Sequence, residues 1–144
     1  MRLLDPNVEL FLTDFIRVEL TALADPRWDV DAGFISNREW QPPAANTNAP
    51  PPAWQVIVRD DGISDDELTV GITVLAGDVD NPDPAKQLAA IVKAIVKDCV
   101  RIDPTNPITA VLEFNGPYSV DDDSGVQARR YMNCTLGTVS TPLT

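Results

Sequence analysis

Residues 68–102 constrain the fold most, because they predict a strand joined by a short acidic turn to an amphipathic helix. Alternate residues from Leu68 to Val74 are apolar, which places them on one face of a strand. After residues 82–84, apolar side chains recur at three- and four-residue steps, as in a helix with one apolar face. We expect that helix to end at residues 103–104. Its apolar face must fold back onto the sheet that holds the strand.

The rest of the chain predicts a second helix and further strands. The opening helix is expected over residues 5–24, with Asp5 as N-cap and Pro6 as its first residue. Residues 60–66 are predicted to turn the chain between two strands of a hairpin, residues 115–125 to connect a second hairpin, and residues 140–144 to fray. The predicted strands cover residues 28–37, 54–59, 68–75, 108–114 and 128–139. We therefore expect an α+β fold: a two-layer sandwich of an about five-stranded mixed or antiparallel sheet with two helices on one face.

One loop is unusual in composition. Residues 41–53 include five prolines, and they cannot form regular hydrogen-bonded structure because proline has no backbone N–H. A loop of this length in a compact domain is usually either functional or disordered, so a flexible insertion and an interaction loop both remain open. Trp40, Pro43 and Pro51 are its candidate contact residues.

Composition excludes several classes of function. The 144 residues are expected to form a single domain over residues 1–144. The net charge of −11 argues against binding of nucleic acid through a basic surface. The chain has no histidine, and its two cysteines, Cys99 and Cys134, are predicted to be reduced core residues and not zinc ligands. The first residues do not predict a signal peptide, so we expect the protein to be made in a reducing cytoplasm.

Two acidic segments are candidate metal or catalytic sites. Asp121, Asp122 and Asp123 resemble the start of a calcium loop, but no glutamate follows at the position of the bidentate ligand. Residues 60–67 form a second acidic cluster in a polar turn, without an apolar pocket to shift a pKa. Solvated turns are the simpler interpretation, so no catalytic residue, cofactor or metal is predicted. A small metal- or ligand-binding α+β domain that uses these acidic turns remains the alternative from another class.

Basic residues form two candidate contact surfaces. The helical spacing of Lys86, Lys93, Lys97 and Arg101 places them together, opposite the apolar face of their helix. This stripe is either a solvated face or a docking face for an acidic partner, which could be a second copy of the chain. The pair Arg129 and Arg130, beside the acidic turn at residues 121–123, is the next basic cluster.

Three stretches together resemble the tail-terminator (tail-completion) proteins of long-tailed bacteriophages. The first is the strand at residues 68–77 with the helix at residues 85–96, and the second is the connection at residues 115–125 leading to Arg129, Arg130 and Tyr131. The third is the opening helix before the extended segment at residues 28–37. The similarity covers nearly the whole chain in order and spacing.

The resemblance implies a structural virion protein without a catalytic residue or a cofactor. Such a protein forms a hexameric ring on the tail tube, ends tube polymerisation and joins the tube to the head–neck connector. The implied partners are other copies of the chain, the tail-tube protein and the connector protein, while DNA passes through the ring without specific binding. The implied location is the tail or neck of the virion, assembled in the host cytoplasm. A different neck or head-completion connector protein is the alternative within this class.

Overall fold

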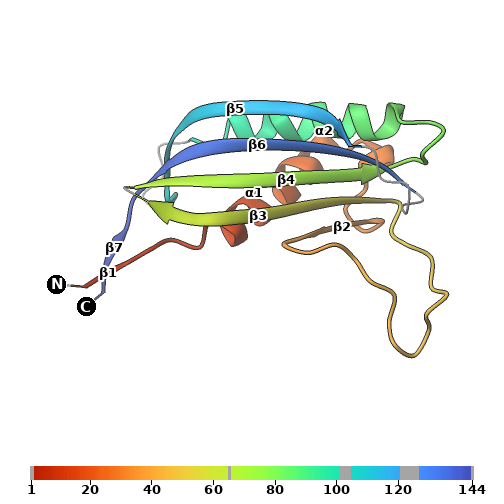
Figure 1. Ribbon diagram of the computed structural model, residues 1–144, viewed down its shortest axis with the longest axis horizontal. Helices are drawn as coiled ribbons and strands as arrows, with labels where there is room; N and C mark the ends of the chain where they lie inside the picture. Colours follow the sequence, from red (N-terminus) through yellow and green to blue (C-terminus); the bar gives the residue numbers. More distant parts are fainter. Residues whose placement is uncertain (1, 65, 101–104, 121–126, 144) are drawn as a thin grey trace.

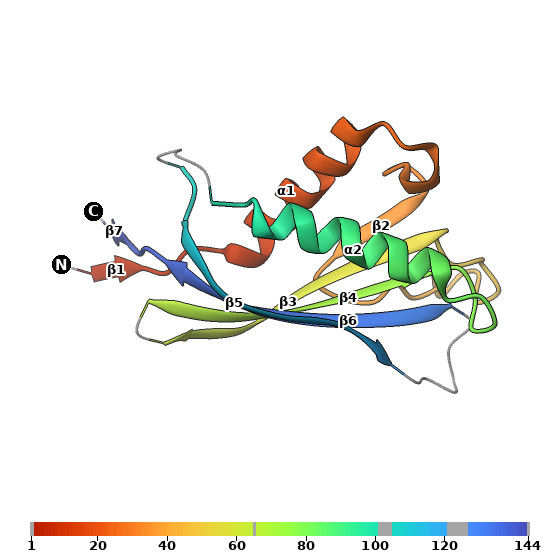
Figure 2. The ribbon, with the colours of Figure 1, turned by 90° about the horizontal axis from the view of Figure 1, so that it is seen from above.

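A five-stranded mixed sheet with two helices on one of its faces forms the body of the molecule (Figure 1). The computed structural model describes residues 2–64, 66–100, 105–120 and 127–143. The α+β fold predicted from the sequence is therefore confirmed. Figure 2 shows the sheet edge-on, with α1 and α2 both lying on one side of it.

The five strands follow the order β2-β3-β4-β6-β5 across the sheet. The two strands β2 and β3 run parallel, and the other neighbours are antiparallel. The strands are β2 (Gly33–Ser36), β3 (Trp54–Ser64), β4 (Glu67–Ala76), β5 (Ile108–Val120) and β6 (Ala128–Thr138). A separate two-stranded sheet pairs β1 (Arg2–Leu4) with β7 (Thr141–Leu143), so the prediction that residues 140–144 fray is wrong for the paired segment.

The opening helix α1 (Val8–Leu23) begins later than predicted. Its N-cap is Asn7, whose side-chain oxygen accepts a hydrogen bond from the Leu10 N–H at 3.0 Å. Asp5 instead accepts a hydrogen bond from the Ser140 hydroxyl, which ties the start of the chain to its end. A short 3-10 helix, η1 (Pro26–Trp28), ends where the predicted strand over residues 28–37 begins. A turn at residues 30–32 follows, so only β2 is extended.

The second helix, α2 (Asp83–Lys97), ends earlier than predicted. The N–H of Asp98 bonds to Ile95 O and the N–H of Cys99 bonds to Val96 O, both at 3.1 Å. These short-range bonds tighten the last turn and bring Cys99 into the core, where it is fully buried. The predicted end at residues 103–104 lies outside the described residues.

The core lies between the helices and the inner face of the sheet. It is built from alternate residues of the central strands and from the apolar stripes of both helices, as their periodicity predicts. Its largest buried side chains include Leu12, Ile16, Leu20, Trp54, Leu68, Ile72, Leu88, Met132 and Leu136. Both cysteines are free and buried, which confirms their prediction as core residues.

The strands of both hairpins continue further than the sequence predicted. The strand β3 runs through residues 60–64, because a register shift between Asp60 and Ile63 absorbs the extra residues without ending the pairing. Likewise β5 continues to Val120, with register shifts that include one between Asn115 and Tyr118. Chain segments predicted as turns therefore belong to the sheet.

Candidate interaction surfaces

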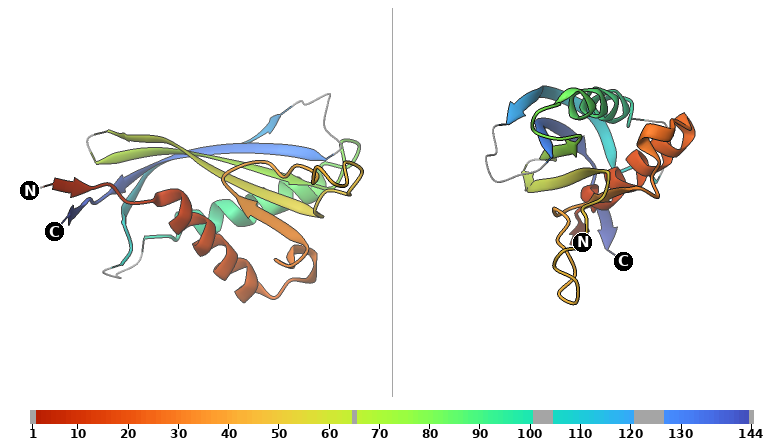
Figure 3. Two further views of the ribbon diagram at one scale, coloured as in Figure 1. Left: turned by 90° about the horizontal axis from the view of Figure 1, so that it is seen from below. Right: turned by 90° about the vertical axis from the view of Figure 1, so that its right-hand side faces the viewer.

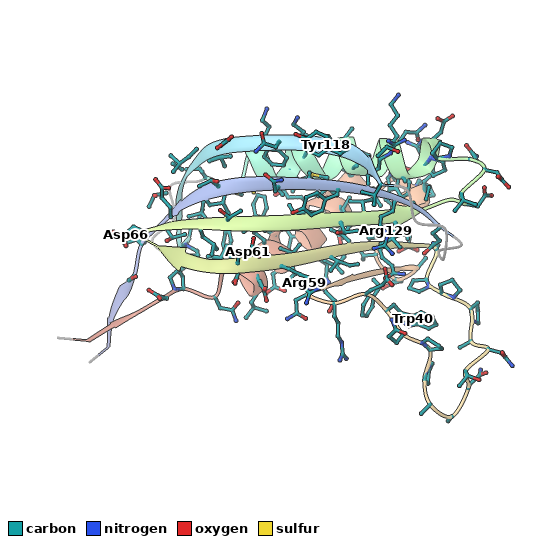
Figure 4. The ribbon with its side chains drawn as sticks, viewed as in Figure 1. Trp40, Arg59, Asp61, Asp66, Tyr118 and Arg129 are labelled. Carbon is teal, nitrogen blue, oxygen red and sulfur yellow. The ribbon has the colours of Figure 1, made fainter. Side chains whose placement is uncertain are left out.

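The face of the sheet that points away from the helices carries two exposed tyrosines on neighbouring strands. Figure 4 labels one of them, Tyr118. Tyr118 of β5 and Tyr131 of β6 are directly paired, and Tyr131 is paired in turn with Thr73 of β4. Tyr118 is 51% exposed and Tyr131 is 36% exposed. The Tyr131 ring lies across β4, because a Cβ atom at Gly71 would come within 2.9 Å of its hydroxyl oxygen.

The next row of the same face carries two paired amides. Asn115 and Asn133 are partners in the β5–β6 ladder, and Asn115 Nδ2 donates a hydrogen bond to Asn133 Oδ1 at 3.0 Å. We call Thr73, Asn115, Tyr118, Tyr131 and Asn133 the tyrosine patch. Each of these side chains is neutral, and Asn115 Nδ2 also donates a hydrogen bond to Glu113 Oε1 at 3.4 Å at the border of the patch.

The stem of the proline-rich loop covers the other end of this face. The backbone N–H of Trp40 donates a hydrogen bond to Gln55 Oε1 at 3.0 Å, and Arg129 Nη2 forms an ion pair with Glu39. Gln55 is only 3% exposed, although it points away from the main core. The half-buried Trp40 is therefore part of an ordered stem.

The returning end of the loop is held by a second set of hydrogen bonds. Gln127 Nε2 donates to the carbonyl oxygens of Pro52 and Ala53, each at 3.1 Å. The N–H of Ala53 donates to Ala32 O at 3.0 Å. Both ends of the loop are thus held in place, by contacts with β3, with β6 and with the residues that precede β2 and β6.

Between these ends the proline loop, residues 41–53, extends away from the sheet (Figures 1 and 3). The N–H of Asn46 bonds to Pro43 O at 3.0 Å, and the N–H of Ala49 bonds to Asn46 O at 3.2 Å, so two tight turns shape its tip. Pro43 and Pro51 are both exposed. The loop is therefore a shaped projection with accessible prolines.

The predicted stripe of basic residues on α2 is not uniformly solvated. Lys86 and Lys97 are exposed, as expected, but Lys93 is half-buried. Lys93 Nζ donates a hydrogen bond to Gly116 O at 2.7 Å and lies 5.3 Å from the centre of the Phe114 ring. Lys93 thus joins α2 to β5 within the chain, and Arg101 lies outside the described residues.

Arg129 and Arg130 do not form one basic cluster. They are consecutive residues of a strand, so their side chains point to opposite faces of the sheet. Arg129 is paired with Leu75 in the ladder and binds Glu39 on the outer face, whereas the half-buried Arg130 is paired with Val74, a core residue of the inner face. The acidic turn expected beside them, with Asp121, Asp122 and Asp123, lies outside the described residues.

The acidic residues that the structure describes do not converge on a metal site. Across residues 2–64, 66–100, 105–120 and 127–143, no three histidine, cysteine, aspartate or glutamate side chains lie together as metal ligands. Asp60 and Asp61 are spread along β3 rather than gathered in a turn, and the Asp60 N–H donates to Glu9 Oε2 at 2.8 Å. The alternative metal-binding hypothesis therefore has no described ligand cluster at residues 60–67.

Burial suppresses the reactivity of both thiols. Desolvation raises the pKa of Cys99 from its ordinary value of 9.0 to about 11. Desolvation, with a smaller contribution from the nearby Cys99, raises the pKa of Cys134 to about 12. Both groups are protonated at neutral pH, and a protonated thiol is a poor nucleophile.

The sequence does not predict either tyrosine of the patch as a contact residue. The alternation of the last predicted strand places Tyr131 and Asn133 opposite Met132 and Cys134. It therefore predicts that Tyr131 and Asn133 share the exposed face of that strand. Tyr118 was assigned to a connecting turn. Its position beside Tyr131 depends on the extension of β5, for which the sequence has no local signal.

Comparisons with known proteins add no family assignment, because neither a family model nor a curated protein matches the chain. Among the helices that the structure describes, none is long and apolar enough to cross a membrane.

Proposed function

We propose that this protein is a structural virion protein that forms a ring, six copies in its closed form, on the end of a phage tail tube. The ring ends tube polymerisation and offers its other side to the head–neck connector. The observation that carries the proposal is the presence of two dissimilar surfaces at separate positions on one sheet. The proline loop leaves the β2–β3 edge, while the tyrosine patch lies toward the β5 edge.

Separate, dissimilar surfaces suit a head-to-tail contact between copies. In such a contact one surface of each copy meets a different surface of the next, and the series closes into a ring when the rotation between copies allows it. A two-fold dimer would instead use the same surface twice. The arrangement therefore supports a cyclic assembly, as the resemblance to tail-terminator proteins implies.

The charge of the chain supports a ring through which DNA passes. Each copy carries a net charge of −11, so six copies present a strongly negative assembly. DNA phosphates are repelled by such a surface, because tight non-specific binding to DNA depends on lysine and arginine contacts. A negative lumen would let DNA move through without adhering.

Imaging of tail tubes incubated with the purified protein tests this function. We expect a single ring of six copies at one end of each tube, seen by negative-stain microscopy, and a native mass of the detached ring equal to six chains. Calcium and magnesium should leave the melting temperature unchanged. Tubes without a bound ring, together with a metal-dependent rise in melting temperature, would instead support the metal-binding class.

A further inference from the structure

We propose that the proline loop of one copy docks on the tyrosine patch of the next copy. This inference rests on the proposed ring assembly and names the contact that would hold neighbouring copies together. The occupant of the patch is thus a defined segment, residues 41–53 of another copy of the same chain.

The two surfaces are chemically matched. Proline-rich segments are already extended and lose little conformational entropy on binding, and they are commonly recognised by exposed aromatic side chains. Pro43, Pro50 and Pro51 are exposed on the loop. Tyr118 and Tyr131, paired on neighbouring strands, offer two adjacent rings. Tyrosine also supplies a hydroxyl that can donate to the free carbonyl oxygens of a proline-rich backbone.

Both surfaces are formed by neutral side chains. Residues 41–53 contain no charged side chain, in a chain that has 22 acidic and 11 basic residues. The five side chains of the tyrosine patch are also neutral, with Glu113 and Arg129 beside them on the same face. Copies with a net charge of −11 repel one another, and contact through two neutral surfaces reduces that repulsion where they meet.

The proline loop of a copy extends away from the tyrosine patch of the same copy (Figure 1). The strand order β2-β3-β4-β6-β5 places β2 and β3, which the loop connects, at one edge, and the paired tyrosines lie on the two strands at the other edge. The stem reaches β6 through the ion pair of Glu39 with Arg129. The stem is fixed at both ends by hydrogen bonds, and the loop extends away from the sheet (Figure 1). The tip of the loop therefore lies away from the patch of its own copy (Figure 1), and the proposed occupant is the loop of another copy.

Thiol crosslinking tests the contact directly in the full-length protein. The variant carries Pro51→Cys in the loop and Thr135→Cys, which lies two residues from Asn133 on the same face of β6, at the end of the patch away from the loop stem. The native thiols do not interfere, because Cys99 and Cys134 are buried and protonated at neutral pH. We expect a short bismaleimide to produce a ladder of dimers, trimers and larger species on a denaturing gel.

Matched variants separate this contact from random collision. The control pair, Pro51→Cys with Leu10→Cys, places the second thiol on α1, where Leu10 is 57% exposed on the helix side. We expect no ladder from it. Adding Tyr118→Ala to the test variant should weaken pairing about tenfold, as truncation of a central aromatic side chain commonly does, whereas Tyr118→Phe should preserve the ladder. Thermal melting of each variant verifies that it is folded.

A ladder no stronger than that of the control pair would overturn the proposed contact, and so would a ladder that Tyr118→Ala leaves unchanged. The outcome of the crosslinking experiment does not depend on whether the protein ends tail-tube polymerisation, which we call the cap function. If the ladder forms but tails lacking the protein keep their normal length, the contact stands and the cap function fails. If the ladder is absent but tail length is lost, the cap function stands and another surface joins the copies.

Discussion

The indole ring of Trp54 lies directly on the backbone of Gly33, since a Cβ atom at position 33 would come within 2.2 Å of two of its ring carbons. The two residues are also paired in the parallel β2–β3 ladder. Trp54 is almost fully buried and meets Trp28 edge to face, with ring centroids 6.5 Å apart. This contact fixes where β2 and β3 meet, and therefore where the proline loop is held.

Gly33→Ala should destabilise the protein, because the added methyl group cannot fit beside the indole. We expect a loss of about 1–3 kcal/mol in the free energy of unfolding, the usual cost of overpacking a core. Urea denaturation measures this loss of unfolding free energy. Ala32→Ser, at the exposed neighbouring position, is the control and should change stability by less than about 0.5 kcal/mol. Equal stabilities of the two variants would contradict the packing described.

Gly71→Ala should weaken the assembly more than it weakens the fold. The new methyl group would meet the hydroxyl end of the Tyr131 ring, which can swing away toward solvent and so disturb the tyrosine patch. We expect a clear loss of crosslinked ladder with a small change in melting temperature. Thr69→Ala, an exposed position on the same face of β4, is the control. A full ladder from Gly71→Ala would show that the orientation of Tyr131 does not matter.

Lys93→Met should destabilise the monomer, although the sequence placed this residue on a stripe that is either solvated or a docking face. The change keeps the apolar stem but removes the donor to Gly116 O and the charge above the Phe114 ring. We expect a loss of about 1 kcal/mol in unfolding free energy. Lys97→Met, at an exposed position of the same helix, should cost less than about 0.5 kcal/mol. If both variants cost the same, the Lys93 contact contributes nothing.

Stability should fall as the pH rises above the ordinary thiol pKa of 9.0. In the folded protein burial raises the pKa of Cys99 to about 11 and that of Cys134 to about 12, so the unfolded chain loses these protons first. The contribution of the two buried thiols to the free energy of unfolding is fully present below pH 9.0. It is lost as the pH rises through the pKa values that the thiols have in the folded protein.

Urea denaturation across that alkaline range, with and without Cys134→Ala, isolates the effect of this thiol from other titrating groups. The variant should show a shallower decline of stability with pH, whatever its stability at neutral pH. Parallel declines would show that Cys134 has an ordinary pKa in the folded protein.

The sequence predicted the elements whose residues interact locally. The period of the apolar residues in α2 and the alternation in β4 identified the core strand and helix correctly, because both patterns follow from the geometry of a single element. Long-range contacts were not predictable in this way. The contact of Lys93 with Gly116 requires β5 to run beside α2, and the β1–β7 pairing joins the two ends of the chain.

The candidate interaction surfaces could be predicted only in part, because one of them depends on long-range contacts. The unusual composition of the proline loop marked it from the sequence alone, whereas the tyrosine patch exists only because β5 and β6 pair Tyr118 with Tyr131. The assignment of Arg129 and Arg130 to one cluster was wrong, because neighbouring residues of a strand face opposite sides.

The length of tails assembled without this protein is the most direct test of the proposed cap function. Electron microscopy of lysates from a phage that lacks its gene should show tails of uncontrolled length that are not joined to heads. Supplying the protein in trans should restore a single tail length. Tails of normal, uniform length in its absence would contradict the account.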